Sequence, residues 1–109
     1  MTCRDAVLFS NRAMALIKMT MYEEAESDCD RALKLEPINA KTYLRRGTSR
    51  AAQSRFAEAE KDFRRVLDIE PDNAQAKIEL RNCRTMMKQL EEASAAGASL
   101  LPTPGVGNA

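Results

Sequence analysis

Residues 24–39 read EAESDCDRALKLEPIN, and residues 58–73 read EAEKDFRRVLDIEPDN. The first stretch closes on Leu-Glu-Pro at Pro37 and the second on Ile-Glu-Pro at Pro71, one step of 34 residues later. The same step, carried over residues 6–73 without a gap, makes 11 of 34 positions identical. The identical pairs are Ala6/Ala40, Arg12/Arg46, Glu24/Glu58, Ala25/Ala59, Glu26/Glu60, Asp28/Asp62, Arg31/Arg65, Leu33/Leu67, Glu36/Glu70, Pro37/Pro71 and Asn39/Asn73. The chain is therefore a tandem repeat.

Each repeat contains two stretches whose apolar residues recur at helical spacing. The first stretch, residues 6–19, carries Leu8, Phe9, Ala13, Leu16 and Ile17. The next has a stripe formed by Tyr22, Ala25, Cys29, Ala32 and Leu33, which returns one step later as Phe56, Ala59, Phe63, Val66 and Leu67. We expect helices over 40–53 and 55–69 in the second repeat, followed by a helix of about 20 residues towards Ala95. The apolar face of that last helix is formed by Ala76, Leu80, Cys83, Met87 and Leu90.

Short polar signals predict where these helices begin. Each repeat ends in a proline followed two residues later by an asparagine, in the pairs Pro37/Asn39 and Pro71/Asn73. The proline disfavours continuation of one helix, and the asparagine can cap the next. Thr20 and Glu23 match the T-x-x-E pattern of a capping box, and Ser54 is expected to cap the second helix of the second hairpin.

A 34-residue unit of two helices resembles the tetratricopeptide repeat (TPR), in which hairpins stack because one alone cannot bury its apolar face. The resemblance implies an all-α fold, with TPR hairpins over 6–39 and 40–73 and a capping helix over 74–95, in a right-handed superhelical stack. Residues 1–5 are expected to be the end of a missing preceding repeat or a linker. Residues 96–109 hold three of the four glycines, so we expect a disordered tail there.

The composition excludes several classes of function. Charged residues make up 30% of the chain and aromatic residues 5%, but the net charge is only +1, which disfavours nucleic acid as a partner. The three cysteines form no CxxC pair, histidine is absent and the glycines are isolated, so no metal site, cofactor or enzyme active site is predicted. We expect Cys29 to be a buried core residue. No apolar run is long enough to span a membrane and the N-terminus does not read as a signal peptide, which favours the cytoplasm or the nucleus.

The candidate functional residues are polar side chains on the first helix of each hairpin that the core does not require. Asn11 and Lys18 lie seven residues apart with Met14 between them, and Lys41 and Arg45 lie four residues apart, so each set shares one helix face. Asn11 and Arg45 are one repeat apart, which should place the two faces side by side. Asparagine is a poor residue inside a helix, so Asn11 suggests a function. An ammonium, a guanidinium and an amide on adjoining helices suit the two carboxylates of a peptide that ends in aspartate.

The segments SNRA at 10–13 and KTYLR at 41–45 resemble the dicarboxylate-clamp TPR domains of heat-shock chaperone adaptors. The resemblance implies binding of the C-terminal Glu-Glu-Val-Asp peptide of the 70- or 90-kDa heat-shock proteins. Asn11 would bind the terminal carboxylate, Lys41 and Arg45 would hold the last aspartate, and Lys18 would reach an acidic side chain upstream. Within this family the chain is most similar to adaptors of RNA polymerase and dynein-arm assembly, through NRAMA at 11–15 and RRGT at 45–48.

Two alternatives compete with the clamp. In the first alternative, the cationic residues are ordinary solvated helix residues. In the second, the chain is a TPR scaffold that docks a protein partner without a clamp ligand. The acidic residues of the first repeat read as solvated surface, namely Glu23, Glu24, Glu26 and Asp28.

The first helix should be uncovered on one flank, because a TPR clamp domain usually has one hairpin more than this chain. The flank around Leu8, Phe9 and Leu16 would then be exposed, and we expect self-association through it. Arg50 stands where the general TPR pattern has a large aromatic or apolar residue, and the absent hairpin should also weaken peptide binding, since it supplies further clamp residues.

Overall fold

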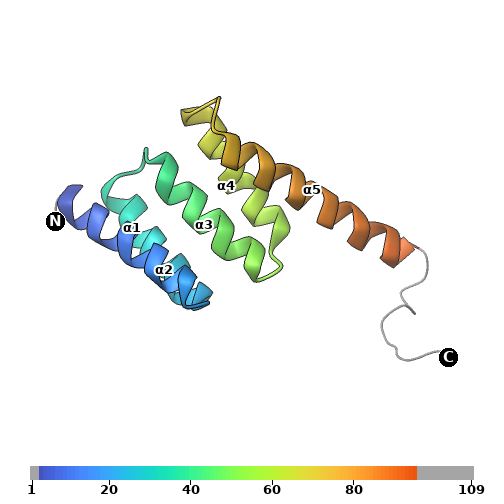
Figure 1. Ribbon diagram of the computed structural model, residues 1–109, viewed down its shortest axis with the longest axis horizontal. Coiled ribbons are helices and arrows are strands. Elements are labelled where there is room, and N and C mark those ends of the chain that lie inside the picture. Colours follow the sequence, from blue (N-terminus) through green and yellow to red (C-terminus); the bar gives the residue numbers. More distant parts are fainter. Residues whose placement is uncertain (1–2, 96–109) are drawn as a thin grey trace.

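The computed structural model describes residues 3–95, which form five α-helices and no strand. The helices are α1 (Cys3–Lys18), α2 (Tyr22–Leu35), α3 (Ala40–Ala52), α4 (Phe56–Ile69) and α5 (Ala74–Ala95). α1 pairs with α2 and α3 pairs with α4, and the pairs stack in chain order, with α5 packed on α4 (Figure 1). The predicted all-α fold is confirmed. The tail expected over 96–109 lies outside the described residues.

The start of α1 differs from the prediction. The helix was expected to begin at residue 6, but it begins at Cys3, so residues 3–5 form its first turn rather than a linker. Asp5 places a carboxylate in that turn, where the partial positive charge of the helix N-terminus favours it.

The Glu-Pro-x-Asn sequence at the end of each repeat ends one helix and caps the next. The Asn39 side-chain oxygen accepts a hydrogen bond from the Thr42 backbone N–H at 3.0 Å, and its amide donates to Glu36. Asn73 does the same one repeat later, accepting from the Ala76 N–H at 2.8 Å and donating to Glu70. The predicted asparagine caps are therefore confirmed. Glu36 and Glu70 recur at the same position of each repeat because each accepts a hydrogen bond from the capping asparagine.

The turns inside the hairpins are built differently from the prediction. Thr20 and Ser54 do not cap the following helices, which begin after Met21 and Arg55 without a side-chain cap. Both residues instead adopt the left-handed conformation, with φ of 58° and 64°. In the first turn the Thr20 N–H bonds to the Ile17 carbonyl and the next N–H to the Leu16 carbonyl, which is a Schellman motif at the C-terminus of α1. The capping box was wrong because these positions end one helix rather than start the next.

The two hairpins share one packing position with different side chains. In the first hairpin Ala13 and Cys29 are fully buried in the same cluster, and burial raises the pKa of the Cys29 thiol to about 12. One repeat later Gly47 and Phe63 take these places. A methyl group built on Gly47 would lie 2.6 Å from the Phe63 ring, so the glycine makes room for the ring. The expectation that Cys29 is a core residue is confirmed.

Asp28, which was predicted to be solvated, is in fact buried between the two helices of its hairpin, and so is its equivalent Asp62. Asp28 has only 3% of its side chain exposed and accepts two hydrogen bonds from Arg12, while Asp62 is held in the same way by Arg46. The helical spacing of the acidic residues could not reveal this, because their partners lie 16 residues away. The repeated Arg/Asp pair therefore joins the two helices of each hairpin.

Glu26 is the second correction, and it joins the two repeats. Its carboxylate accepts hydrogen bonds from Arg50 at 2.8 Å, Arg55 at 2.7 Å and Gln53 at 3.1 Å. Burial alone would raise the pKa of Glu26, but the bonds from Arg55, Arg50 and Gln53 outweigh it and lower this pKa to about 2. This contact also explains why Arg50 replaces the large apolar residue of the general pattern.

α5 continues the repeat register. Arg84, one 34-residue step after Arg50, donates to Glu60 at 3.0 Å, as Arg50 donates to Glu26. Of the predicted apolar face, Ala76, Leu80 and Cys83 are buried, but Leu90 is 54% exposed. The reason is length, because α5 has 22 residues and runs past the end of the 14-residue α4 (Figure 1). α5 is thus the first helix of a third unit.

Candidate functional site

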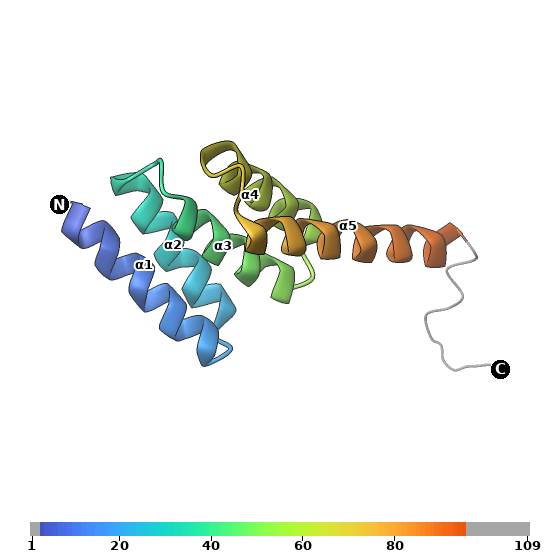
Figure 2. The ribbon, with the colours of Figure 1, turned by 45° about the horizontal axis from the view of Figure 1, so that its top comes forward.

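A groove runs along the first helices of the three successive units. α1, α3 and α5 follow one another along the stack, with α3 in contact with both of the others (Figure 2). The groove between them is lined by Met14 and Ile17 from α1, Lys41, Leu44, Arg45 and Thr48 from α3, and Gln75 and Glu79 from α5. The apolar side chains of its lining come from α1 and α3, and its two cationic groups, Lys41 and Arg45, both come from α3.

Arg45 is held in this groove by the preceding repeat. Its Nη1 donates to the Ser10 carbonyl at 2.7 Å and to the Ser10 hydroxyl at 2.9 Å. The same hydroxyl accepts from Thr42 at 2.9 Å in a buried contact, so Ser10 fixes both the helix and the guanidinium. A longer contact of 3.4 Å joins Arg45 to the Asn11 side-chain oxygen. The predicted juxtaposition of Asn11 and Arg45 is present.

The charge of Arg45 is not balanced within the described part of the chain. Arg45 makes no ion pair there, and its buried Nε has no hydrogen-bond partner. Burial lowers the pKa of Arg45 below its ordinary value, which is the effect of a desolvated cation without a nearby carboxylate. Its neighbour Arg46 is the opposite case, because Asp30 and Asp62 both bind it at 2.8 Å. A partly buried, fixed guanidinium with a spare donor is suited to a carboxylate supplied from outside.

The other predicted residues are distributed unevenly around Arg45. Lys41 lies in the groove one helical turn away, is exposed and makes no ion pair within residues 3–95. Met14, on α1, also lines the groove. Asn11 is exposed beside Arg45, and because its oxygen faces Arg45 its amide N–H₂ remains a donor. Lys18 is the last residue of α1, is exposed and does not line the groove, so its role in reaching an upstream residue stays a prediction.

Sequence reasoning missed several residues of the groove. They are Ile17, Leu44, Thr48, Gln75 and Glu79. The signal that could have found most of them is the repeat itself: one step of 34 takes Met14 to Thr48, Lys41 to Gln75 and Arg45 to Glu79. Glu79 brings a carboxylate to the cationic groove, where Gln75 binds it at 2.7 Å. The third unit therefore differs in charge from the second at the same two positions.

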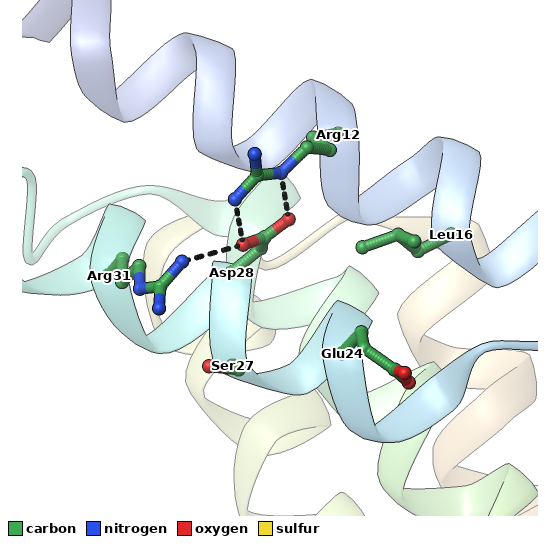
Figure 3. A pocket seen from close by; sticks show the side chains of 6 residues that line it. All are labelled: Arg12, Leu16, Glu24, Ser27, Asp28 and Arg31. Carbon is green, nitrogen blue, oxygen red and sulfur yellow. Dashed lines mark hydrogen bonds and ion pairs between the residues drawn. The ribbon is translucent and has the colours of Figure 1, made fainter.

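A second hollow lies on the outer side of the first hairpin and has a different character (Figure 3). It is lined by Arg12, Leu16, Glu24, Ser27, Asp28 and Arg31. Asp28 lies between the two guanidinium groups, which are 2.6 Å and 3.5 Å away, so both cations here already have a carboxylate partner (Figure 3). The described residues contain no group of side chains suited to a metal ion and no helix long and apolar enough to cross a membrane.

Comparison with known proteins connects this geometry to a family. Residues 6–39 and residues 50–103 each match a model described as tetratricopeptide repeat. RNA polymerase II-associated protein 3 of Xenopus tropicalis is 48% identical over 48 residues, which are 44% of this chain and 7% of that protein. The chain spans only 6% to 7% of the length of such curated relatives.

Two solved structures are similar to most of the chain. The first TPR of Spaghetti (RPAP3) bound to the HSP90 peptide SRMEEVD is 41% identical to this chain, with a TM-score of 0.75. The alignment covers 76% of this chain and 66% of that structure's chain. The second TPR domain of the human RPAP3 protein in complex with the HSP70 peptide SGPTIEEVD is 45% identical to this chain, with a TM-score of 0.71. This alignment covers 73% of this chain and 67% of that structure's chain. The predicted similarity to RNA polymerase-associated adaptors is confirmed.

Proposed function

We propose that this chain, which belongs to the tetratricopeptide repeat family, is a non-catalytic adaptor module that binds the acidic C-terminal peptide of a heat-shock chaperone. The peptide ends in Glu-Glu-Val-Asp or a close variant, and it lies in the groove lined by Met14, Lys41 and Arg45. The observation that carries the proposal is the fixed, partly buried guanidinium of Arg45, which has no counter-ion among residues 3–95.

The groove supplies complementary chemistry on both sides of Arg45. Lys41 places an ammonium one turn away on the same helix, and Asn11 offers an amide donor from the neighbouring repeat. A peptide that ends in aspartate carries its side-chain and terminal carboxylates close together, so both can be met by charge-assisted hydrogen bonds. Because Ser10 holds Arg45 before any ligand arrives, little side-chain entropy is lost on binding.

The apolar residues that line the groove limit which peptide can bind. Ile17 and Leu44 lie beside Arg45 in the groove lining, so an apolar side chain next to the terminal aspartate can be buried there. This arrangement supports an extended peptide with alternating acidic and apolar contacts. The two RPAP3 domains, which were solved with peptides of this kind, share the fold and 41% to 45% of the aligned sequence.

The test is isothermal titration of the purified chain with a synthetic peptide that ends in Glu-Glu-Val-Asp. We expect micromolar binding that weakens with salt. Loss of one charge-assisted contact in Lys41→Ala or Arg45→Gln should weaken binding about 10- to 100-fold. Lys61→Ala is the matched control, because Lys61 is an exposed lysine on α4 outside the groove. No heat, together with no chemical-shift change at Asn11 or Arg45, would show that the proposal is wrong.

A scaffold without a clamp ligand is the alternative, and the uncovered flank of α1 favours it. Leu8 is 60% exposed there. Capture of a protein partner that is insensitive to Arg45→Glu would support this alternative. We place either function in the cytoplasm or the nucleus, which suits the free, buried thiols of Cys29 and Cys83.

A further inference from the structure

Four cationic side chains lie along a single face of α5, and we call this set the α5 stripe. Its members are separated by four, three and four residues, which places them on one helix face over about 16 Å. They are Lys77, Arg81, Arg84 and Lys88, and all four are exposed. Glu79 lies two residues from both Lys77 and Arg81, so it points roughly 160° away from them around the helix. The α5 stripe is therefore on the far side of α5 from the peptide groove, which Glu79 lines.

The charge of the α5 stripe is largely uncompensated within residues 3–95. Arg84 donates to Glu60 on α4 at 3.0 Å, but the same carboxylate also pairs with Arg64 at 3.5 Å. The other three members of the stripe make no ion pair within these residues. Because neighbouring members stand three or four residues apart, their like charges also repel across each helical turn. A partner that brings carboxylates to this face would relieve the repulsion.

The repeat register shows that α5 cannot use this face as α1 and α3 use theirs. Steps of 34 residues relate Ala13, Gly47 and Arg81. Ala13 and Gly47 are buried where the first helix of each hairpin packs on the second. At Gly47 the approach is so close that a methyl group would lie 2.6 Å from the Phe63 ring. A helix cannot come that near to an arginine, so the face with Arg81 is left for a partner that binds charge.

The spacing of the stripe indicates which acidic partner fits it. Carboxylates on a second helix at the same spacing advance along the axis at the same rate, so all four contacts can form together. In an extended chain, the side chains on one side recur every ~6.6 Å, against an average of about 5.5 Å between members of the stripe. The extended chain is therefore out of step by about 3 Å at the fourth contact. The stripe fits an acidic helix better than an extended acidic segment.

Two other classes of partner match the stripe less well. The exposed carboxylates of Glu91 and Glu92 follow it on the same helix, where they would repel the phosphates of a nucleic acid. A protein helix can end opposite Lys88, whereas a nucleic acid continues past it. The apolar side of α5, which includes Leu80 and Cys83, packs against α4 and is not available to a membrane.

We propose that the α5 stripe is a docking surface for an acidic helix of a partner protein. That helix carries aspartate or glutamate at positions i, i+4, i+7 and i+11, and these carboxylates meet the four cations in register. Arg81 lies within the contact, where α1 and α3 have a small buried residue. The proposal does not depend on peptide binding in the groove.

The probe is a synthetic alanine-based helical peptide with glutamates at the same spacing, titrated into the nitrogen-15-labelled chain at low salt. A second peptide of identical composition distributes the glutamates around all faces of the helix. We expect chemical-shift changes centred on Arg81 and an affinity for the first peptide at least about five-fold above that for the second. Lys77→Gln with Arg81→Gln should weaken binding of the first peptide about 5- to 10-fold. The matched control is Arg31→Gln with Lys34→Gln, which removes the same charge from exposed positions on α2 and should change little.

Charge reversal separates a specific stripe from general attraction. With Lys77→Glu and Arg81→Glu, the chain should prefer a peptide with lysines at the same spacing to one with glutamates. The proposal is overturned if the two glutamate peptides bind equally or not at all, or if the control variant weakens binding as much as the stripe variant. It is also overturned if a DNA duplex or an anionic phospholipid vesicle binds the stripe more tightly than the peptide does. A Glu-Glu-Val-Asp peptide should bind the stripe variant as it binds the wild type; if it does not, the stripe belongs to the groove's ligand and the proposal is again overturned.

Discussion

Replacement of Glu26 by glutamine should remove much of the contact between the two repeats. The carboxylate has 13% of its side chain exposed and binds two arginines and one glutamine of the next repeat. Its pKa of about 2, against 4.5 for an unperturbed glutamate, corresponds to at most about 3 kcal/mol of stability at neutral pH. Arg50 and Arg55 keep a second carboxylate each, in Asp62 and Glu58, so we expect Glu26→Gln to cost about 2 kcal/mol.

The assay is urea unfolding followed by circular dichroism at several pH values. The lowered pKa means that the unfolded chain binds a proton at Glu26 more readily, so the stabilisation is complete above about pH 4.5 and is lost as the pH falls towards about 2. The difference between the wild type and Glu26→Gln should therefore be largest at pH 7 and should shrink steadily below pH 4.5. Glu24→Gln is the control, because Glu24 is exposed and has no ion pair within the described chain. Equal effects of the two substitutions at pH 7 would refute the reasoning.

Three further substitutions test other parts of the structure. Gly47→Ala should destabilise the chain by about 1 to 3 kcal/mol, since the new methyl group meets the Phe63 ring at 2.6 Å, and Phe63→Leu in the same chain should recover part of the loss in urea unfolding. Thr20→Gly should raise the free energy of unfolding by about 0.5 to 1 kcal/mol, because a β-branched residue at φ 58° is strained; a loss of stability would contradict the Schellman assignment. Glu79→Gln should tighten binding of an acidic peptide about three-fold in a titration at low salt, because it removes a negative charge from the groove, and unchanged affinity would place the peptide elsewhere.

The repeat step accounts for most of what the sequence could predict. It located the helix boundaries at Asn39 and Asn73, because proline and asparagine act on the residues next to them. It also placed Asn11 beside Arg45, because equivalent positions of stacked repeats are neighbours. Local signals were less reliable at Thr20, where a T-x-x-E match could not reveal that the residue ends a helix in the left-handed conformation.

The contacts between distant residues could not be predicted from the helical pattern. Glu26 and Asp28 lie on polar stretches of α2 and look solvated, but their partners are arginines on other helices. The groove residues of α5 were missed for another reason. Gln75 and Glu79 are the equivalents of Lys41 and Arg45 one more 34-residue step along the chain, beyond the two hairpins that the repeat step defines.

The most direct test of the central claim asks whether Arg45 binds the side-chain carboxylate of the last aspartate of the peptide. Two peptides, one ending in Glu-Glu-Val-Asp and one ending in Glu-Glu-Val-Asn, are titrated against the wild type and Arg45→Gln. We expect the change to asparagine to weaken binding to the wild type about 10-fold or more, and to weaken binding to Arg45→Gln much less, because the substituted chain has already lost the contact. If the change to asparagine has the same effect on both proteins, Arg45 does not bind that carboxylate and the proposed site is wrong.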